Sequence, residues 1–195
     1  RDDMVIKDNR QLIAALEKSG DLVPINKEVD WDLEVGAIVR RVNEQRGPAV
    51  LFNKIKDYPP GYRILGVPLA SYRRVAIAMG LKPETTIRDI HAEVDRRLNH
   101  PLQPKVVTKA PCQENIILGD DVDLYRFPSP YIHEGDGGRY IGTWHIVISK
   151  DPDSDWASWS MYRLMLYNKR YISGLWRPTA GIGEILYKKY VPFNK

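Results

Sequence analysis

The sequence predicts an α+β protein in two parts, and three observations lead to this prediction. Residues 1–112 alternate between amphipathic helical patterns and short apolar runs, as in an α/β domain. Residues 113–195 carry four of the five tryptophans and show the pattern of antiparallel strands joined by short polar turns. Three prolines near residues 100–113 are typical of a linker between the parts. We therefore expect domains at 1–112 and 113–195.

The first part should contain four helices. Residues 8–20 predict a helix with Asp8 as its N-cap and Gly20 as its stop. A helix at 82–100 should begin at a cap formed by Thr85 or Thr86. The other two helices are expected at 32–47 and 71–80. Between the helices, residues 22–26 predict a short extended segment, and apolar runs predict buried strands at 48–53 and 63–69.

The second part should contain three long strands and the beginning of a helix. The strands are expected at about 139–149, 157–167 and 170–176, with turns at KDPDSD and NK. A helix should follow within 177–190. Three strands cannot bury both faces by themselves, so this sheet is expected to be unfinished.

Composition excludes several classes of protein. The net charge is +4, but Lys and Arg are interleaved with Asp and Glu, and no basic stripe with stacking aromatics indicates nucleic-acid binding. No apolar run approaches the roughly 18 residues of a membrane span. The single cysteine, Cys112, excludes an internal disulfide and fits an inert core thiol in a reducing compartment. We expect a cytoplasmic protein that binds neither nucleic acid nor membrane.

The segment DWASWSMYRLML, residues 155–166, predicts a strand with a permanent cation in it. Alternation places on one face Ala157, Trp159, Met161, Arg163 and Met165. The other face carries Trp156, Ser158, Ser160, Tyr162 and Leu164. The first face is apolar except for Arg163, so we expect this guanidinium to be buried. A buried guanidinium needs an anion or a set of carbonyls, which either the protein or a ligand can supply.

Two glycine-containing segments allow a structural or a functional interpretation. GDGGRYIG, residues 135–142, is not a dinucleotide fingerprint and fits a turn that opens a strand. Residues 179–183 surround the start of the last predicted helix, where exposed amides could hold a phosphate or simply form a flexible helix entry.

Two histidines suggest a possible metal site. His133 and His145 are twelve residues apart, one in a predicted loop and one on a predicted strand. Glu134 and Asp136 lie near the first of them and could add carboxylate ligands.

The run from Asp136 to Leu166 resembles the UbiD family of prenylated-flavin-dependent decarboxylases. A family segment of the type DGG(R/K)YI corresponds to 136–141, an Asn-x-Ser-x-x-Arg strand to 158–163, and a Thr/Ser-Gly-Leu/Met segment to 173–175. GPAVLFNKIKDYP and DDVDLYRFPSP are similar to earlier family segments. The likeness covers almost the whole chain in the family's order and spacing.

The resemblance implies an N-terminal α/β domain followed by the first part of a split β-barrel that binds flavin. Family members are more than twice as long as this chain. The remaining barrel strands, an oligomerisation domain and the proton-donating carboxylates are therefore expected beyond Lys195, and the fragment alone should be inactive.

The resemblance also implies site residues. Those matching cofactor-binding positions are Thr143, Ser160, Met161, Tyr162 and Arg163. Arg163 matches, in addition, the catalytic arginine that pairs with the substrate carboxylate.

Two positions depart from the family's metal site. Ser158 stands where the family has an asparagine ligand, and Gly181, preceded by Ala180, stands where it has a histidine. Ser158 could still offer an oxygen, whereas Gly181 has no side chain to give. The metal, Mn or Mg with K, joins the flavin phosphate to the protein in the family. Here the resemblance implies another phosphate anchor, such as 179–183, a displaced alignment, or a subunit without flavin.

The expected function is a reversible decarboxylase of an aromatic or α,β-unsaturated carboxylic acid that uses prenylated FMN. An alternative is a non-catalytic, UbiD-like scaffold subunit of a multi-subunit carboxylase. A third possibility is an ordinary FMN-binding split-barrel protein, which does not account for the N-terminal domain. A homo-oligomer or a UbiD-like multi-subunit complex is expected.

Overall fold

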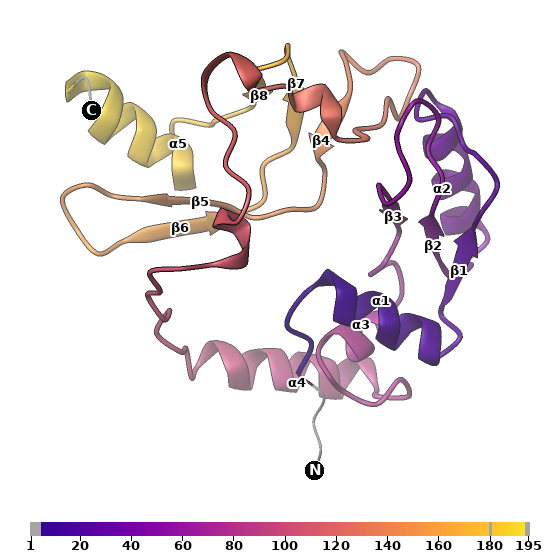
Figure 1. Cartoon of the computed structure of the whole chain (residues 1–195). Coiled ribbons are helices and arrows are strands. Elements are labelled where there is room, and N and C mark those ends of the chain that lie inside the picture. The colour runs from indigo at the N-terminus through magenta and orange to yellow at the C-terminus, as the bar shows by residue number, and fades with distance from the viewer. Residues whose placement is uncertain (1–4, 180, 194–195) are drawn as a thin grey trace. The chain divides into compact units, whose positions relative to one another are not determined.

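The computed structural model describes residues 5–179 and 181–193 (Figure 1). Within these ranges the chain forms two compact units. The first comprises the residues up to Asp30 together with Ala37–Asp121, and the second comprises Trp31–Gly36 together with the residues from Val122 onward. The domain boundary expected at 112/113 stays a prediction. None of the helices in the described ranges combines the length and hydropathy needed to cross a bilayer.

The first unit contains a mixed three-stranded sheet in the order β1-β2-β3. β1 (Leu22–Ile25) runs parallel to β2 (Ala49–Phe52), which pairs antiparallel with β3 (Ile64–Gly66). All four residues of β2 are buried. A continuous apolar run is typical of a strand covered on both faces, so this central position follows from the sequence. The expected extended segment and the two expected strands are confirmed, each shorter than its sequence pattern.

All four helices expected in the first part are present: α1 (Asn9–Lys18), α2 (Glu34–Glu44), α3 (Tyr72–Ala78) and α4 (Ile87–Leu98). The Asp8 side chain accepts a hydrogen bond from the Gln11 amide, and Thr86 caps α4 in the same way through the Asp89 amide. Each cap satisfies an amide that the helix leaves unpaired.

The core of the first unit joins α1 and α3 to the sheet. Its buried members are Leu12, Leu16, Leu22, Ala49, Leu51 and Ile77. The apolar face of α1 therefore supplies much of the burial that stabilises this sheet. Cys112 lies outside this core: it is exposed in the 3-10 helix η1 (Pro111–Gln113), so the prediction of a core thiol is wrong.

The second unit includes the short segment Trp31–Gly36. Asp32 and Tyr131 form a parallel bridge, in which the Leu33 amide donates to the Tyr131 carbonyl at 2.9 Å. The guanidinium of Arg139 lies 3.9 Å from the centre of the Trp31 ring, a cation–π contact. This segment thus packs against residues about a hundred positions later in the sequence.

Five short strands replace the three long ones expected in the second part. The first predicted strand is divided into β4 (Tyr140–Gly142) and β5 (Val147–Lys150). The second is divided into β6 (Ala157–Ser160) and β7 (Leu164–Leu166). The third is shortened to β8 (Ile172–Gly174). The strands form a β4-β7-β8 sheet and a β5-β6 hairpin, and among the described residues they do not close into a barrel.

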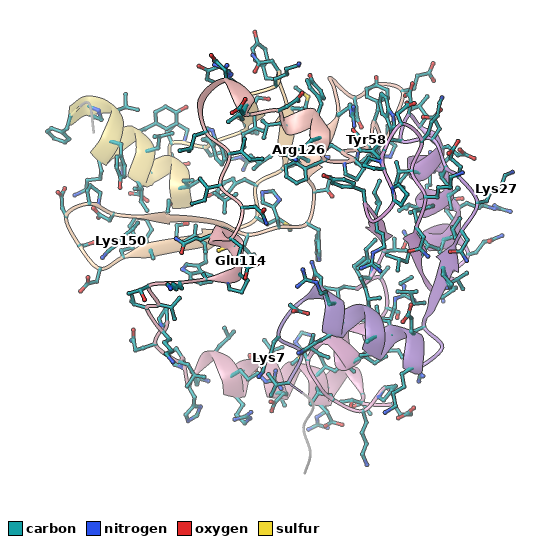
Figure 2. All side chains as sticks on the ribbon, in the orientation of Figure 1. Lys7, Lys27, Tyr58, Glu114, Arg126 and Lys150 are labelled. Atoms are coloured by element: carbon teal, nitrogen blue, oxygen red, sulfur yellow. The ribbon has the colours of Figure 1, made fainter. Side chains whose placement is uncertain are left out.

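Short helical turns lie on both sides of the boundary between the units and at the end of the described chain. The 3-10 turn η2 (Gly119–Asp121) is the last element of the first unit, and the 3-10 turn η3 (Leu124–Arg126) lies in the second unit. The expected last helix is α5 (Gly181–Ile185), which continues as the π-helical turn η4 (Leu186–Tyr190) and the 3-10 turn η5 (Val191–Phe193). Figure 1 shows α5 beside the β5-β6 hairpin, and the two are in contact. The Tyr190 hydroxyl donates to the carbonyl of Lys150, which Figure 2 labels at the end of β5.

Candidate functional site

The central feature of the second unit is a gap in one long hairpin. Gly142 pairs with Leu164, and Val147 pairs with Ser160, so the same two chain segments form a ladder on both sides of the gap. Between these pairs, residues 143–146 lie opposite residues 161–163. No backbone hydrogen bond joins these two stretches in the part of the chain that the structure describes. Backbone N–H and C=O groups are therefore left for another partner, such as a ligand.

The gap brings together the residues predicted to bind the cofactor. Thr143 lies on one edge of it, directly after β4, and Ser160 is the last residue of β6. Met161, Tyr162 and Arg163 form the other edge. The five residues thus come from two facing stretches of one hairpin. Their binding roles stay predictions.

The alternation predicted for residues 157–163 is present, but the face that is covered is the one with the hydroxyl groups and not the one with Arg163. Ser158 is only 7% exposed and Ser160 and Tyr162 are half-buried, whereas Trp159 is 60% exposed. Arg163 is also exposed, so the prediction of a buried guanidinium is wrong. The reason is that α5 packs on β5 and β6 over the face that carries Ser158.

Arg163 has an aromatic neighbour in place of an internal carboxylate. Its guanidinium carbon lies 5.5 Å from the centre of the Tyr140 ring, within the range of a cation–π contact. Among the described residues no carboxylate forms an ion pair with it. The charge is therefore accessible to an anion from outside these residues.

His145 lies in the same gap. A β-carbon at Gly142 would overlap the His145 ring and lie 2.9 Å from its Nε2, so the ring rests directly on the glycine. Both ring nitrogens are shielded from solvent and have no hydrogen-bond partner in the described chain. Unsatisfied buried polar atoms are rare and costly. Sequence reasoning considered His145 only as a metal ligand and missed its packing on Gly142.

The metal site suggested for His133 and His145 is not formed. His133 Nδ1 lies 3.6 Å from Asp136 Oδ2, an exposed loop contact. The residues that the structure describes contain no group of three or more His, Cys, Asp or Glu side chains that could hold a metal ion. The glycine-rich turn before β4 has a packing role instead: a β-carbon at Gly137 or Gly138 would lie 3.3 Å from Met165 Sδ.

The two positions that match the family's metal ligands do meet in space, but their donor set does not fit a metal. A β-carbon on Gly181 would lie 3.1 Å from Ser158 Oγ and would overlap the Tyr162 hydroxyl. That hydroxyl accepts a hydrogen bond from the Ile182 amide at 3.1 Å. The space of the missing side chain is thus filled by a neutral phenol. Ala180 lies outside the described residues.

The fold is that of a two-part α+β protein whose second part contains a gap between two facing stretches of one hairpin. Comparison with known sequences specifies the class further. The 3-octaprenyl-4-hydroxybenzoate carboxy-lyase N-terminal domain matches residues 13–94, and the Rift-related domain of the same family matches residues 105–192. The chain belongs to the UbiD family.

Curated relatives include two decarboxylases of aromatic acids. The chain is 43% identical over 186 residues to the pyrrole-2-carboxylic acid decarboxylase of Pseudomonas aeruginosa, which covers 91% of this chain and 38% of that protein. It is 36% identical over 177 residues to ferulic acid decarboxylase 1 of Saccharomyces cerevisiae, covering 85% of this chain and 35% of the relative. The chain thus spans little more than a third of the length of these relatives.

Solved structures of UbiD-class enzymes have the same fold. The closed form of vanillic acid decarboxylase from Sedimentibacter hydroxybenzoicus matches 94% of this chain and 40% of its own, with a TM-score of 0.86 and 30% identity. A UbiD-class enzyme from Pelotomaculum thermopropionicum in complex with prFMN matches 87% of this chain and 38% of its own, with a TM-score of 0.72 and 29% identity. The predicted family and the mixed helix and strand class are therefore confirmed.

Proposed function

We propose that this chain is the front part of a prenylated-FMN-dependent decarboxylase, reversible as a carboxylase, that acts on an aromatic or α,β-unsaturated carboxylic acid. The observation that carries the proposal is the gap in the hairpin, where the matched cofactor positions face each other across open backbone groups. The activities named for the related decarboxylases support the substrate class.

The residues around the gap carry groups that could contact the ring system of a flavin. Thr143 on one edge and Ser160, Met161 and Tyr162 on the other supply hydroxyl, thioether and aromatic groups. Unpaired backbone groups beside them could satisfy the polar edge of an isoalloxazine. Prenylated FMN would supply the electron sink that decarboxylation requires and that no amino-acid side chain provides.

Arg163 would hold the substrate carboxylate. It is exposed and lies against the Tyr140 ring, without a carboxylate partner among the described residues. A fixed cation beside the gap would orient the carboxylate of the acid toward the cofactor and would stabilise negative charge there. The proton donor would belong to the part of the family's length that this chain does not span.

A second candidate function is a non-catalytic UbiD-like scaffold subunit. The specific observation in its favour is the pair Ser158 and Gly181 at the matched metal positions. Under either function we propose a cytoplasmic protein that assembles as a homo-oligomer or in a multi-subunit complex.

The two functions are separated by assaying the flavin-loaded full-length protein with a panel of aromatic and α,β-unsaturated acids. We expect the proposed enzyme to form the decarboxylated products. Arg163→Ala should lower turnover by about a hundredfold or more, the typical loss when one electrostatic contact to the reacting groups is removed, and should leave the flavin absorbance in place.

The matched control is Arg126→Ala, which removes an exposed arginine of the same unit (Figure 2). It should have unchanged turnover. Turnover that Arg163→Ala does not change would overturn the role of Arg163. Flavin-free protein without turnover on any acid would favour the scaffold subunit.

A further inference from the structure

We infer that Tyr162 replaces, in this chain, the metal link between the β6 strand and the start of α5, so that the cofactor side of the site is held without a divalent cation. The inference rests on the proposed function, since it concerns how a flavin-binding site is held together. The family's asparagine and histidine ligands are replaced here by Ser158 and Gly181, and the inference assigns to Tyr162 the connection between these two positions.

The Tyr162 hydroxyl occupies the space beside the two matched ligand positions. It lies where a side chain on Gly181 would begin, and Ser158 Oγ borders the same space. The positions matched to the asparagine and histidine ligands therefore contact each other through this phenol. Any metal at this point would have to displace it.

The oxygen atoms of Ser158 and Tyr162 are poorly suited to bind the family's metal. Mn²⁺ and Mg²⁺ prefer carboxylate, carbonyl and water oxygens, whereas Ser158 and Tyr162 carry neutral hydroxyls. The Ile182 amide also directs its proton toward the Tyr162 oxygen. The positive end of the N–H dipole opposes a cation there and occupies a lone pair that a metal would need.

The backbone of Gly181 has a φ of +53°. This left-handed conformation strains residues that have a β-carbon. A histidine at this position would therefore pay a backbone cost in addition to its overlap with Tyr162. Both the backbone conformation of residue 181 and the position of the Tyr162 hydroxyl therefore favour glycine at this position.

The hydrogen bond from Ile182 to Tyr162 connects the two segments that carry the matched ligand positions. It joins the edge of the gap to the first turn of α5, and the Tyr162 ring also packs on Trp176 at 5.1 Å between ring centres. Because Tyr162 directly precedes Arg163, the same bond fixes the stretch that presents the arginine. Tyr162 is thus a positioning residue for this stretch.

The first test compares Tyr162→Phe, which removes only the hydroxyl, with the control Tyr167→Phe, whose side chain is 71% exposed. A net hydrogen bond contributes about 1 kcal/mol, so we expect Tyr162→Phe to lower the Tm of the full-length protein by about 2–4 °C at most. We also expect several-fold faster loss of flavin from the loaded protein. The control should change neither quantity, and equal behaviour of the two variants would overturn the inference.

The second test measures metal content by mass spectrometry before and after dialysis against EDTA. We expect far less than one divalent metal per chain, and we expect flavin retention that EDTA does not change. One metal per chain that leaves together with the flavin would overturn the inference.

The third test tries to rebuild the metal site. The double variant Ser158→Asn/Gly181→His should remain without Mn²⁺, because the Tyr162 hydroxyl still fills the space. Adding Tyr162→Ala should raise the Mn²⁺ content, as measured by electron paramagnetic resonance. Equal Mn²⁺ in the double and triple variants, whether high or low, would contradict the assignment.

These readouts separate the inference from the proposed function. The Tm shift of Tyr162→Phe and the Mn²⁺ content of the rebuilt site can both be measured on flavin-free protein. If the protein binds no flavin, the proposed function fails, while a Tm shift confined to Tyr162→Phe still supports the tyrosine link.

Discussion

Replacement of Gly36 by alanine tests the packing of Trp31–Gly36 within the second unit. Gly36 is buried in α2, and a β-carbon there would overlap the Ile132 carbonyl oxygen and lie 2.9 Å from its carbonyl carbon. In a helix alanine is otherwise favoured over glycine by up to about 1 kcal/mol. The sign of the effect therefore depends on whether the overlap outweighs the helix preference.

The structure predicts that the overlap dominates. The obstructing atoms are backbone, and the adjacent Asp32–Tyr131 bridge holds that backbone in place, so it cannot move aside cheaply. Overpacking typically costs about 1–3 kcal/mol, and rigid backbone contacts lie at the upper end of this range. After the helix preference is subtracted, we expect a net loss of about 2 kcal/mol and a Tm lower by about 4–8 °C.

Thermal unfolding followed by circular dichroism measures this effect. The matched control is Gly135→Ala, since a β-carbon on Gly135 meets no atom within 4 Å and the residue has no positive φ. The control should stay within about 0.5 kcal/mol of the parent, as most surface substitutions do. A Gly36→Ala protein with an unchanged or higher Tm would show that Trp31–Gly36 does not pack on residues 131–132.

Two further predictions concern single side chains. The carboxylate of Glu93 accepts hydrogen bonds from Arg96 and Arg97, which lower its pKa from 4.5 to about 2. The contribution of this carboxylate to folding stability is therefore complete above pH 4.5 and is lost as the pH falls through about 2. Glu93→Gln should lower the Tm at pH 7, and the difference from the parent should narrow below pH 4.5; a difference that does not change with pH would contradict the ion-pair origin. Gly142→Ala should displace the His145 ring, which rests on this glycine, and should thereby weaken flavin retention; retention equal to that of the parent would show that the ring has no part in forming the gap.

The first unit could largely be predicted from local sequence signals. The caps at Asp8 and Thr86 and the apolar run of β2 identify their elements through short-range chemistry alone. Such signals act within a few residues, so they do not depend on the rest of the fold.

The site could be predicted only in part. Residues 143–146 and 161–163 have strong strand patterns, and their lack of pairing is a property of the two stretches together. Alternation identified the two faces of β6, but contact with α5 decides which face is covered, so the burial of Arg163 was predicted wrongly. The Tyr162–Ile182 bond joins residues that no local pattern connects.

Bound prenylated FMN is the central requirement of the proposed decarboxylase, and native mass spectrometry of the full-length protein tests for it. The protein would be purified from cells that also make prenylated FMN, and the masses of the intact complex and of the released ligand would be recorded. We predict one prenylated FMN for each chain. A chain that carries no flavin after this preparation would contradict the proposed decarboxylase and would leave Arg163 as an exposed arginine beside Tyr140.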